Sequence, residues 1–246
     1  MNRDKIASLE QSAGVYESKV IAGWEDLYRQ KRRRLFDCFA PWFRGQRALE
    51  MGVADGEMSA RIAHSFPQLT IVDGSRLHLE QTMVRLRALG VAGVETVHSM
   101  FEDYTPSTAF DAVFMAHTLE HLEDPVAVLR RVTAWLASGG RVFMAVPNCN
   151  SLHRHVGVKM GLLSRIDALN EQDRLVGHAR VYDPKLFRDH VAAAGLREVH
   201  FGGLMVKPLD NRQMQTWSPE LIEALFAISN DFPEICSEIY VVAERA

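Results

Sequence analysis

The chain alternates short apolar runs with segments in which apolar residues recur every three or four positions. The short runs predict buried strands, and the three-to-four spacing predicts amphipathic helices. The predicted strands are 48–51, 69–72, 94–97, 110–115, 140–146, 196–206 and 238–243. The predicted helices are 15–43, 56–65, 76–89, 124–137 and 183–195, with one more from 218. Strands separated by helices predict an α/β fold with a mainly parallel sheet and helices on both faces.

The first predicted strand ends in a turn that is typical of ligand-binding α/β sheets. The segment Arg47-Ala-Leu-Glu-Met-Gly-Val-Ala-Asp-Gly-Glu57 contains an acid, Glu50, at the end of the strand and glycines at 52 and 56. Glycine allows positive φ and lets a ligand approach the backbone. The turn therefore predicts a ligand at the carboxyl edge of the sheet, although an ordinary strand-to-helix turn has the same pattern.

A second acid strengthens this interpretation. Asp73 ends the next apolar run, 23 residues after Glu50. This is the distance at which a βαβ unit presents a carboxylate to a ribose. A buried strand that ends in a carboxylate also requires partners for it. The pair predicts a nucleoside bound across two adjacent strand ends.

Composition and charge narrow the class of protein. The 246 residues carry a formal charge of -3, which gives no general reason to bind nucleic acid or an anionic membrane. The basic run at 31–34 is expected to be a solvated helix face. Three distant cysteines predict neither disulfides nor a metal site. The first residues lack an apolar signal-peptide core and no apolar run reaches the ~20 residues of a membrane span, so we expect a cytoplasmic protein.

Several spaced motifs together resemble the class I S-adenosylmethionine (SAM)-dependent methyltransferases, in particular their ubiquinone-biosynthesis-like branch. The motifs are Leu49-Glu-Met-Gly-Val-Ala-Asp-Gly56, Val72-Asp-Gly-Ser75, Phe110-Asp-Ala-Val113, Leu119-Glu-His-Leu-Glu-Asp-Pro125, Leu136-Ala-Ser-Gly-Gly140 and Val146-Pro-Asn148. One departure is Ala54, which replaces the middle glycine of the family's turn. The resemblance implies a Rossmann-like, doubly wound, mostly parallel seven-stranded sheet with an antiparallel last strand.

The resemblance also implies a domain plan and a cofactor site. One domain, 1–246, would comprise a helical cap (1–44), a SAM-binding core (45–150), an acceptor-covering segment (151–183) and the rest of the sheet (184–246). SAM would be bound and S-adenosyl-L-homocysteine released. Glu50 and the turn through Gly52, Ala54 and Gly56 would hold the methionyl part, and Asp73 the ribose hydroxyls. The residues expected around the adenine and the reacting methyl are Met100, Phe101, Glu102, His117 and Thr118.

Two histidines are candidates for a general base, because the pKa of histidine lies near neutrality. His121 follows the fourth predicted strand, and His178 lies in the segment that usually covers the acceptor. Either one also fits a structural role in fixing a loop. No metal site is predicted.

The acceptor is expected to be a small molecule, most readily a hydroxyl, with nitrogen and carbon left open. Five basic residues against three acids between 151 and 182 suit an anionic acceptor, although a solvated surface has the same composition. The apolar residues of this segment are expected to pack over the pocket, and Trp24 and Tyr28 either to close the cofactor cleft or to anchor the core. Two other classes share the fold: a nicotinamide-dependent oxidoreductase, whose Gly-x-Gly-x-x-Gly spacing the chain lacks, and a non-catalytic binding module.

Overall fold

The computed structural model describes residue 10 and residues 25–246. Seven strands form one sheet in the order β3-β2-β1-β4-β5-β7-β6. Strands β1 to β5 pair in parallel, and β7 is antiparallel to both of its neighbours. The strands are β1 Arg47–Met51, β2 Gln68–Asp73, β3 Glu95–His98, β4 Phe110–Ala116, β5 Leu136–Pro147, β6 Leu196–Leu204 and β7 Glu238–Arg245. The predicted mostly parallel, doubly wound sheet with an antiparallel last strand is confirmed.

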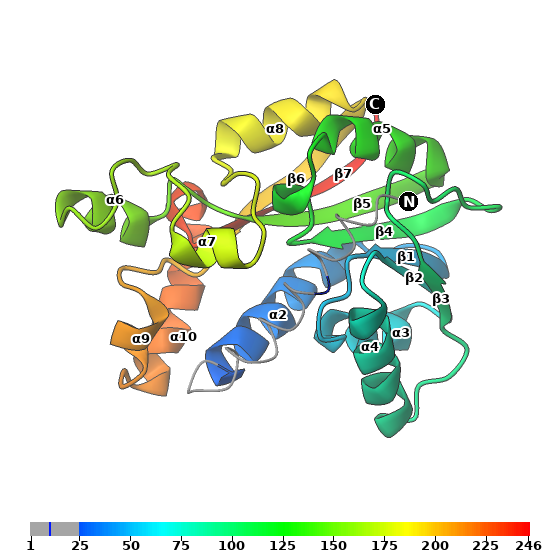
Figure 1. Cartoon of the computed structure of the whole chain (residues 1–246), viewed down its shortest axis with the longest axis horizontal. Helices are drawn as coiled ribbons and strands as arrows, with labels where there is room; N and C mark the ends of the chain where they lie inside the picture. The colour runs from blue at the N-terminus through cyan, green and yellow to red at the C-terminus, as the bar shows by residue number, and fades with distance from the viewer. Residues whose placement is uncertain (1–9, 11–24) are drawn as a thin grey trace.

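Helices cover both faces of the sheet (Figure 1). The α-helices are α2 Glu25–Phe39, α3 Glu57–Ser65, α4 Arg76–Ala88, α5 Pro125–Trp135, α6 Leu152–Lys159, α7 Glu171–Leu175, α8 Pro184–Ala193, α9 Asn211–Met214 and α10 Pro219–Ala227. Short 3-10 turns are η1 Ala40–Trp42, η2 Leu119–His121, η3 Ile228–Asn230 and η4 Pro233–Ile235. The part of the predicted first helix before Glu25, including Trp24, lies outside the described residues. None of the described helices has the length and apolar character that a membrane span requires.

Two hydrophobic cores lie on opposite faces of the sheet because side chains alternate along each strand. Val113 and Met115 of β4 pack into the core shared with α5 and α8. Ala112 and Phe114, one position away, pack into the core shared with α2, α3 and α10. The central strands are therefore apolar on both faces, as the short apolar runs predict.

Two strands begin or end at other residues than predicted, each for a local structural reason. The strand predicted from residue 140 begins at Leu136, which pairs with Phe110 before a register shift in the β4–β5 ladder. The strand predicted to reach residue 206 ends at Leu204, because Met205 adopts a φ of 62°. An extended ladder cannot continue through that conformation.

The segment between β5 and α8 differs from its prediction more clearly. It contains α6 and α7, yet Met160 and Leu162 are largely exposed and only Val176 of this segment reaches the cavity described below. Figure 1 shows α6 at the periphery of the molecule. The expectation that the apolar residues of this segment pack over the pocket is wrong.

Candidate functional site

The turn after β1 has the conformation that its glycines predict. Gly52, Ala54 and Gly56 all have positive φ, at 85°, 45° and 74°. A Cβ atom on Gly52 would lie 3.0 Å from Thr118 Oγ1, and one on Gly56 would lie 2.9 Å from the Thr82 side chain. The backbone can pass these neighbours only where the side chain is absent.

The two glycines of this turn, Gly52 and Gly56, have different surroundings. Gly52 and Ala54 line a cavity at the carboxyl edge of the sheet. Gly56, at the start of α3, is not on the cavity wall and instead packs against Thr82 of α4. Gly56 was predicted to touch the cofactor, and the structure gives it a packing role between α3 and α4.

Asp73, at the end of β2, holds the turn after β1 in place. Its Oδ2 accepts a hydrogen bond from Val53 N at 2.9 Å, and its Oδ1 accepts one from Ser75 N at 2.7 Å. Each carboxylate oxygen has a second lone pair, and the side chain lines the cavity. The geometry leaves room for the two hydroxyls of a ribose.

Glu50 is a buried acid with unused hydrogen-bonding capacity. Its side chain lines the cavity, only 3% of the residue is exposed, and its Oε2 has no hydrogen-bond partner among the described residues. Burial raises the pKa of this carboxyl to about 8. A cationic ligand group in the cavity would supply the missing partner.

The other predicted cofactor residues lie on the wall of the same cavity. They come from the loop after β3 and from the end of β4, and they are Met100, Phe101, Glu102, His117 and Thr118. Thr118 Oγ1 donates a hydrogen bond to Met51 O at 2.7 Å, which ties the end of β4 to the end of β1. The predicted residues therefore share one site, apart from Gly56 and His178.

Helix α2 forms one wall of the cavity, which is one of the two alternatives predicted for Tyr28, whereas the place of Arg32 on the same wall was not predicted. Tyr28 and Arg32 line the cavity, and Arg32 donates hydrogen bonds to the Tyr28 hydroxyl at 3.1 Å and to His117 Nδ1. Lys31 forms an ion pair with Glu238 at the start of β7. The prediction that the basic run at 31–34 is a solvated face is wrong for its first two residues, because α2 lies across the strand ends and turns them inward.

His117 links α2 to β7. Since its Nδ1 accepts from Arg32, its Nε2 carries the proton and donates to Glu238 Oε2 at 3.0 Å. Burial and the neighbouring Arg32 lower the pKa of His117 to about 4. The ring is therefore neutral near pH 7.

The two predicted catalytic histidines are adjacent, but only one faces the cavity. His121 in η2 lines the cavity, and His178 lies behind it with 4.8 Å between the ring centroids. Burial lowers the pKa of His121 to about 3, and His178 lowers it further. Such an imidazole is neutral and only weakly basic.

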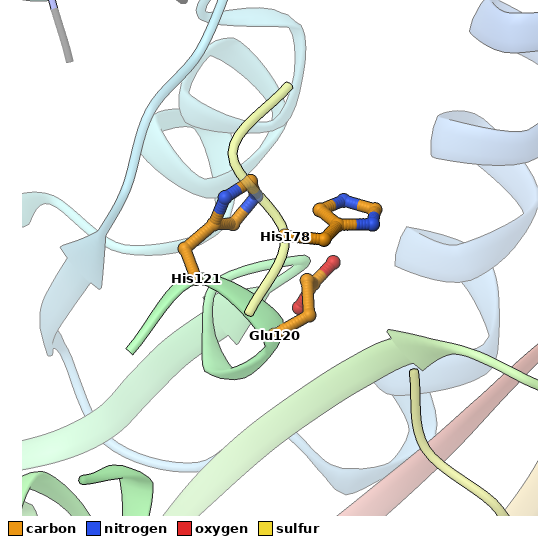
Figure 2. Close-up of side chains that lie close together, drawn as sticks. All are labelled: Glu120, His121 and His178. Atoms are coloured by element: carbon orange, nitrogen blue, oxygen red, sulfur yellow. The ribbon is translucent and has the colours of Figure 1, made fainter. Parts of the chain in front are cut away.

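A third residue joins this pair. Glu120 is fully buried, and neither of its carboxyl oxygens has a hydrogen-bond partner among the described residues. Its carboxyl group points toward His178, and the side chains of Glu120, His121 and His178 gather in one place (Figure 2). Burial raises the pKa of Glu120 to about 7. Sequence reasoning missed Glu120, since its neighbours in the cluster become visible only in the fold.

Three of the five basic residues that suit an anionic acceptor are bound to groups of the protein. Arg154 pairs with Asp173 and donates to two backbone carbonyls, and Arg180 donates to three carbonyls around η2. Arg165 pairs with Asp167 on the surface. These three arginines therefore stabilise the segment and its contact with η2.

A glycine turn after β1, an acid at the end of β2 and a cavity across both strand ends are the parts of a nucleoside site, as a class I SAM-dependent methyltransferase requires. The chain matches the methyltransferase domain family over residues 24–200, and it belongs to that family. It is an enzyme that uses SAM. The oxidoreductase and the non-catalytic module are thereby excluded.

Two relatives indicate the branch of the family. The ubiquinone biosynthesis O-methyltransferase of Vibrio parahaemolyticus is 26% identical over 170 residues, which span 68% of this chain and 70% of the relative. The protein of the same description from Idiomarina loihiensis is 28% identical over 181 residues, 67% of each chain. The resemblance to the ubiquinone-biosynthesis-like branch is confirmed.

Solved structures show the same fold at low identity. The CcbJ methyltransferase of Streptomyces caelestis aligns over 97% of this chain and 98% of its own, with a TM-score of 0.67 and 16% identity. The N-methyltransferase NodS of Bradyrhizobium japonicum, solved with S-adenosyl-L-homocysteine, aligns over 96% and 98% with a TM-score of 0.58 and 12% identity. These similarities concern the architecture alone.

Proposed function

We propose that this enzyme transfers the methyl group of SAM to a hydroxyl oxygen of a small molecule. The observation that carries the proposal is one cavity whose wall brings two acids together with a histidine. Glu50 and Asp73, at the ends of β1 and β2, line it together with His121 of η2, which follows β4. The similarity to O-methyltransferases supports an oxygen acceptor.

Different residues of the cavity can be assigned to the ribose, the methionyl part and the adenine of SAM. We assign the ribose hydroxyls to the carboxylate of Asp73 and the ammonium of the methionyl part to Glu50, whose side chain lines the cavity and whose Oε2 has no hydrogen-bond partner among the described residues. The adenine would lie between Met100, Phe101 and Glu102. This arrangement directs the sulfonium methyl toward the end of β4, where His117 and Thr118 meet the cavity.

The acceptor end must align an oxygen with the S–CH₃ bond and make it nucleophilic. Alignment of this kind supplies several kcal/mol of the barrier reduction. We assign activation of the hydroxyl to the cluster of Glu120, His121 and His178, which meets the cavity through His121. An anionic group on the acceptor would contact Arg32, which lines the same cavity, whereas Arg154, Arg165 and Arg180 of the segment 151–183 are bound to other groups of the protein.

A screen with methyl-labelled SAM tests the proposal. Phenols, catechols, amines and carbon acids are incubated with the enzyme, and mass spectrometry locates the label. We expect O-methyl products from hydroxyl acceptors. Products methylated only on nitrogen or carbon would overturn the oxygen assignment.

Two histidine variants test the acceptor end. His121→Ala is expected to lower kcat at saturating SAM by about 10²–10⁴, the usual contribution of a positioned activating group. His155→Ala is the matched control, because His155 is exposed on α6 and its ring bonds Asn150 Oδ1, away from the cavity. An unchanged kcat in both His121→Ala and His178→Ala would remove the cluster from the mechanism.

A further inference from the structure

We propose that a basic cluster beside the cavity binds a carboxylate group of the methyl acceptor. The basic cluster consists of Lys31 of α2, His153 of α6 and Lys207, which follows β6. Lys31 is the neighbour of Arg32, which lines the cavity. Binding of the carboxylate is independent of the atom that is methylated, whereas its use in orienting an acceptor hydroxyl rests on the proposed function.

The topology of the sheet places the basic cluster next to the cofactor residues, beyond β4. In the strand order, β4 separates β1, β2 and β3 from β5, β7 and β6. Glu238, at the start of β7, is paired with Pro147 at the end of β5 and with Leu204 at the end of β6. Because α6 follows β5 and Lys207 lies shortly after Leu204, both segments reach the sheet edge where Glu238 lies.

Direct contacts join the basic cluster to the cavity wall. His117 lines the cavity, and its Nε2 donates a hydrogen bond to Glu238 Oε2 at 3.0 Å. Glu238 in turn forms an ion pair with Lys31, whose side chain is only 13% exposed. The positive charges of the cluster therefore act on any molecule that is bound against this wall, in surroundings that screen them less than water does.

The cations at this edge exceed the acids that contact them. Lys31 is balanced by Glu238, but Arg32 donates its hydrogen bonds to two side chains that are neutral near pH 7. Lys207 Nζ donates to Asn211 Oδ1 at 3.0 Å and forms no ion pair with a described residue. Charge that is held away from water is costly unless it is paired. A bound anion would supply the missing partner.

The amine of Lys207 is sensitive to such a partner. Burial lowers its pKa to about 7, and the charge of Lys31 lowers it further, whereas the acids Glu238 and Asp210 raise it. Arg154 of α6 is the other cation that faces the amine. An anion beside the amine favours its charged form, so binding of the anion above pH 7 takes up a proton.

His153 offers a second donor at the same place. Its Nδ1 is buried and has no hydrogen-bond partner among the described residues. Burial and the charges of Lys207 and Lys31 lower the pKa of His153 to about 2, so the ring is neutral. A neutral imidazole carries its proton on either nitrogen, and a proton on Nδ1 would be donated to the anion. One ammonium and one imidazole N–H match the two oxygens of a carboxylate.

A matched pair of ligands tests the proposal without any turnover. The full chain, saturated with S-adenosyl-L-homocysteine, is titrated by calorimetry with 3-hydroxybenzoate and with the neutral 3-hydroxybenzamide at pH 6.5. We expect the benzoate to bind about 10-fold or more tightly, and Lys207→Met to weaken its binding by about 10–100-fold, the contribution of a hydrogen bond between charged groups. His153→Leu should weaken it in the same direction. Neither variant should change the affinity for the benzamide.

Lys159→Met is the matched control, because Lys159 is exposed on the same helix as His153. Its affinity for both ligands should equal that of the unaltered chain. Thermal unfolding of every variant confirms that it is folded.

The pH dependence separates a charged subsite from a structural role of Lys207. Because its amine loses its proton above pH 7, affinity for 3-hydroxybenzoate should fall roughly 10-fold between pH 6.5 and pH 8. Lys207→Arg stays charged and should bind the benzoate with a much smaller change over this range. Glu50 and Glu120 titrate in the same range, and the comparison of these two proteins removes their contribution.

The outcomes separate the carboxylate subsite from the methyl transfer. No preference for 3-hydroxybenzoate over 3-hydroxybenzamide, a preference that Lys207→Met leaves intact, or an equal pH dependence in Lys207→Arg would overturn the subsite. Products that are methylated only on nitrogen or carbon would overturn the proposed function and leave the subsite standing.

Discussion

The buried carboxyl of Glu50 predicts that one substitution raises stability and lowers cofactor affinity together. Glu50→Gln replaces an ionisable group with a neutral one of similar shape. In the folded chain burial raises the pKa of Glu50 from 4.5 to about 8. The folded state therefore binds this proton more tightly than the unfolded state does, and stability is lost as the pH rises from 4.5 through 8.

The size of this effect follows from the two pKa values. At about 1.4 kcal/mol per pH unit, the interval between 4.5 and 8 corresponds to about 5 kcal/mol at pH 9. The amide of glutamine also has a burial cost, about 1–3 kcal/mol, which leaves a gain of about 2–4 kcal/mol. For a domain of this size that gain raises Tm by roughly 4–16 °C.

The assay is thermal unfolding of the SAM-free protein between pH 5 and pH 9. The Tm of Glu50→Gln should be equal to or slightly below that of the unaltered chain at pH 5, where the carboxyl is still largely protonated and the burial cost of the amide counts, and it should rise relative to the unaltered chain steadily up to pH 8. Glu80→Gln is the control, because Glu80 is exposed on α4, and its difference should not change with pH. SAM affinity of Glu50→Gln should fall by about 10–100-fold, the contribution of a hydrogen bond to a charged group.

Two results would refute the reasoning. A Tm of Glu50→Gln at pH 9 equal to or below that of the unaltered chain would mean that the carboxylate is not penalised by burial. A gain in stability with unchanged SAM affinity would mean that the unpaired oxygen does not face the cofactor.

Four other substitutions test the turn, the ribose contact and a structural position. Gly52→Ala should lower Tm and SAM affinity, since the φ of 85° at Gly52 and the 3.0 Å approach of a Cβ atom to Thr118 exclude a side chain. Ala54→Gly should leave SAM affinity equal or better, because Ala54 already has a φ of 45° that glycine adopts without strain. Calorimetry that finds tighter SAM binding in Gly52→Ala than in Ala54→Gly would contradict this account. Asp73→Asn should weaken SAM binding by about 1.5–3 kcal/mol, and an unchanged Kd would exclude the ribose contact. Asn148→Ala, which removes two hydrogen bonds to backbone carbonyls, should destabilise the chain by about 1–3 kcal/mol in chemical denaturation while SAM affinity stays the same.

The cofactor end could be predicted from the sequence because it is built from consecutive βαβ units. Glu50, the turn and Asp73 each lie at the end of a strand, and parallel strands bring such ends to one edge of the sheet. Gly56 is the one residue predicted for this turn that does not line the cavity. A glycine that packs against the next helix has the same sequence signal as one that touches a ligand.

The acceptor end could not be predicted in the same way, since its parts are far apart in the chain. Arg32 reaches the cavity from α2, and its neighbours at 31–34 have the composition of a solvated face. His121 and His178 are 57 residues apart, and no spacing rule connects them. The contact between Ala179 N and the backbone oxygen of Glu120 that brings them together belongs to the fold alone.

The two groups of cavity residues should respond differently to substitution, because one is built from the sheet and the other from side chains of separate segments. The cofactor end depends on backbone conformation and strand pairing, so most changes there also affect the sheet. The acceptor end consists of side chains that α2, η2 and the segment after α7 present to one cavity. Substitutions in any one of those segments alter what the cavity accepts while Glu50 and Asp73 keep their partners. Acceptor specificity in this chain is therefore expected to follow residues such as Arg32 and His121 rather than the turn after β1.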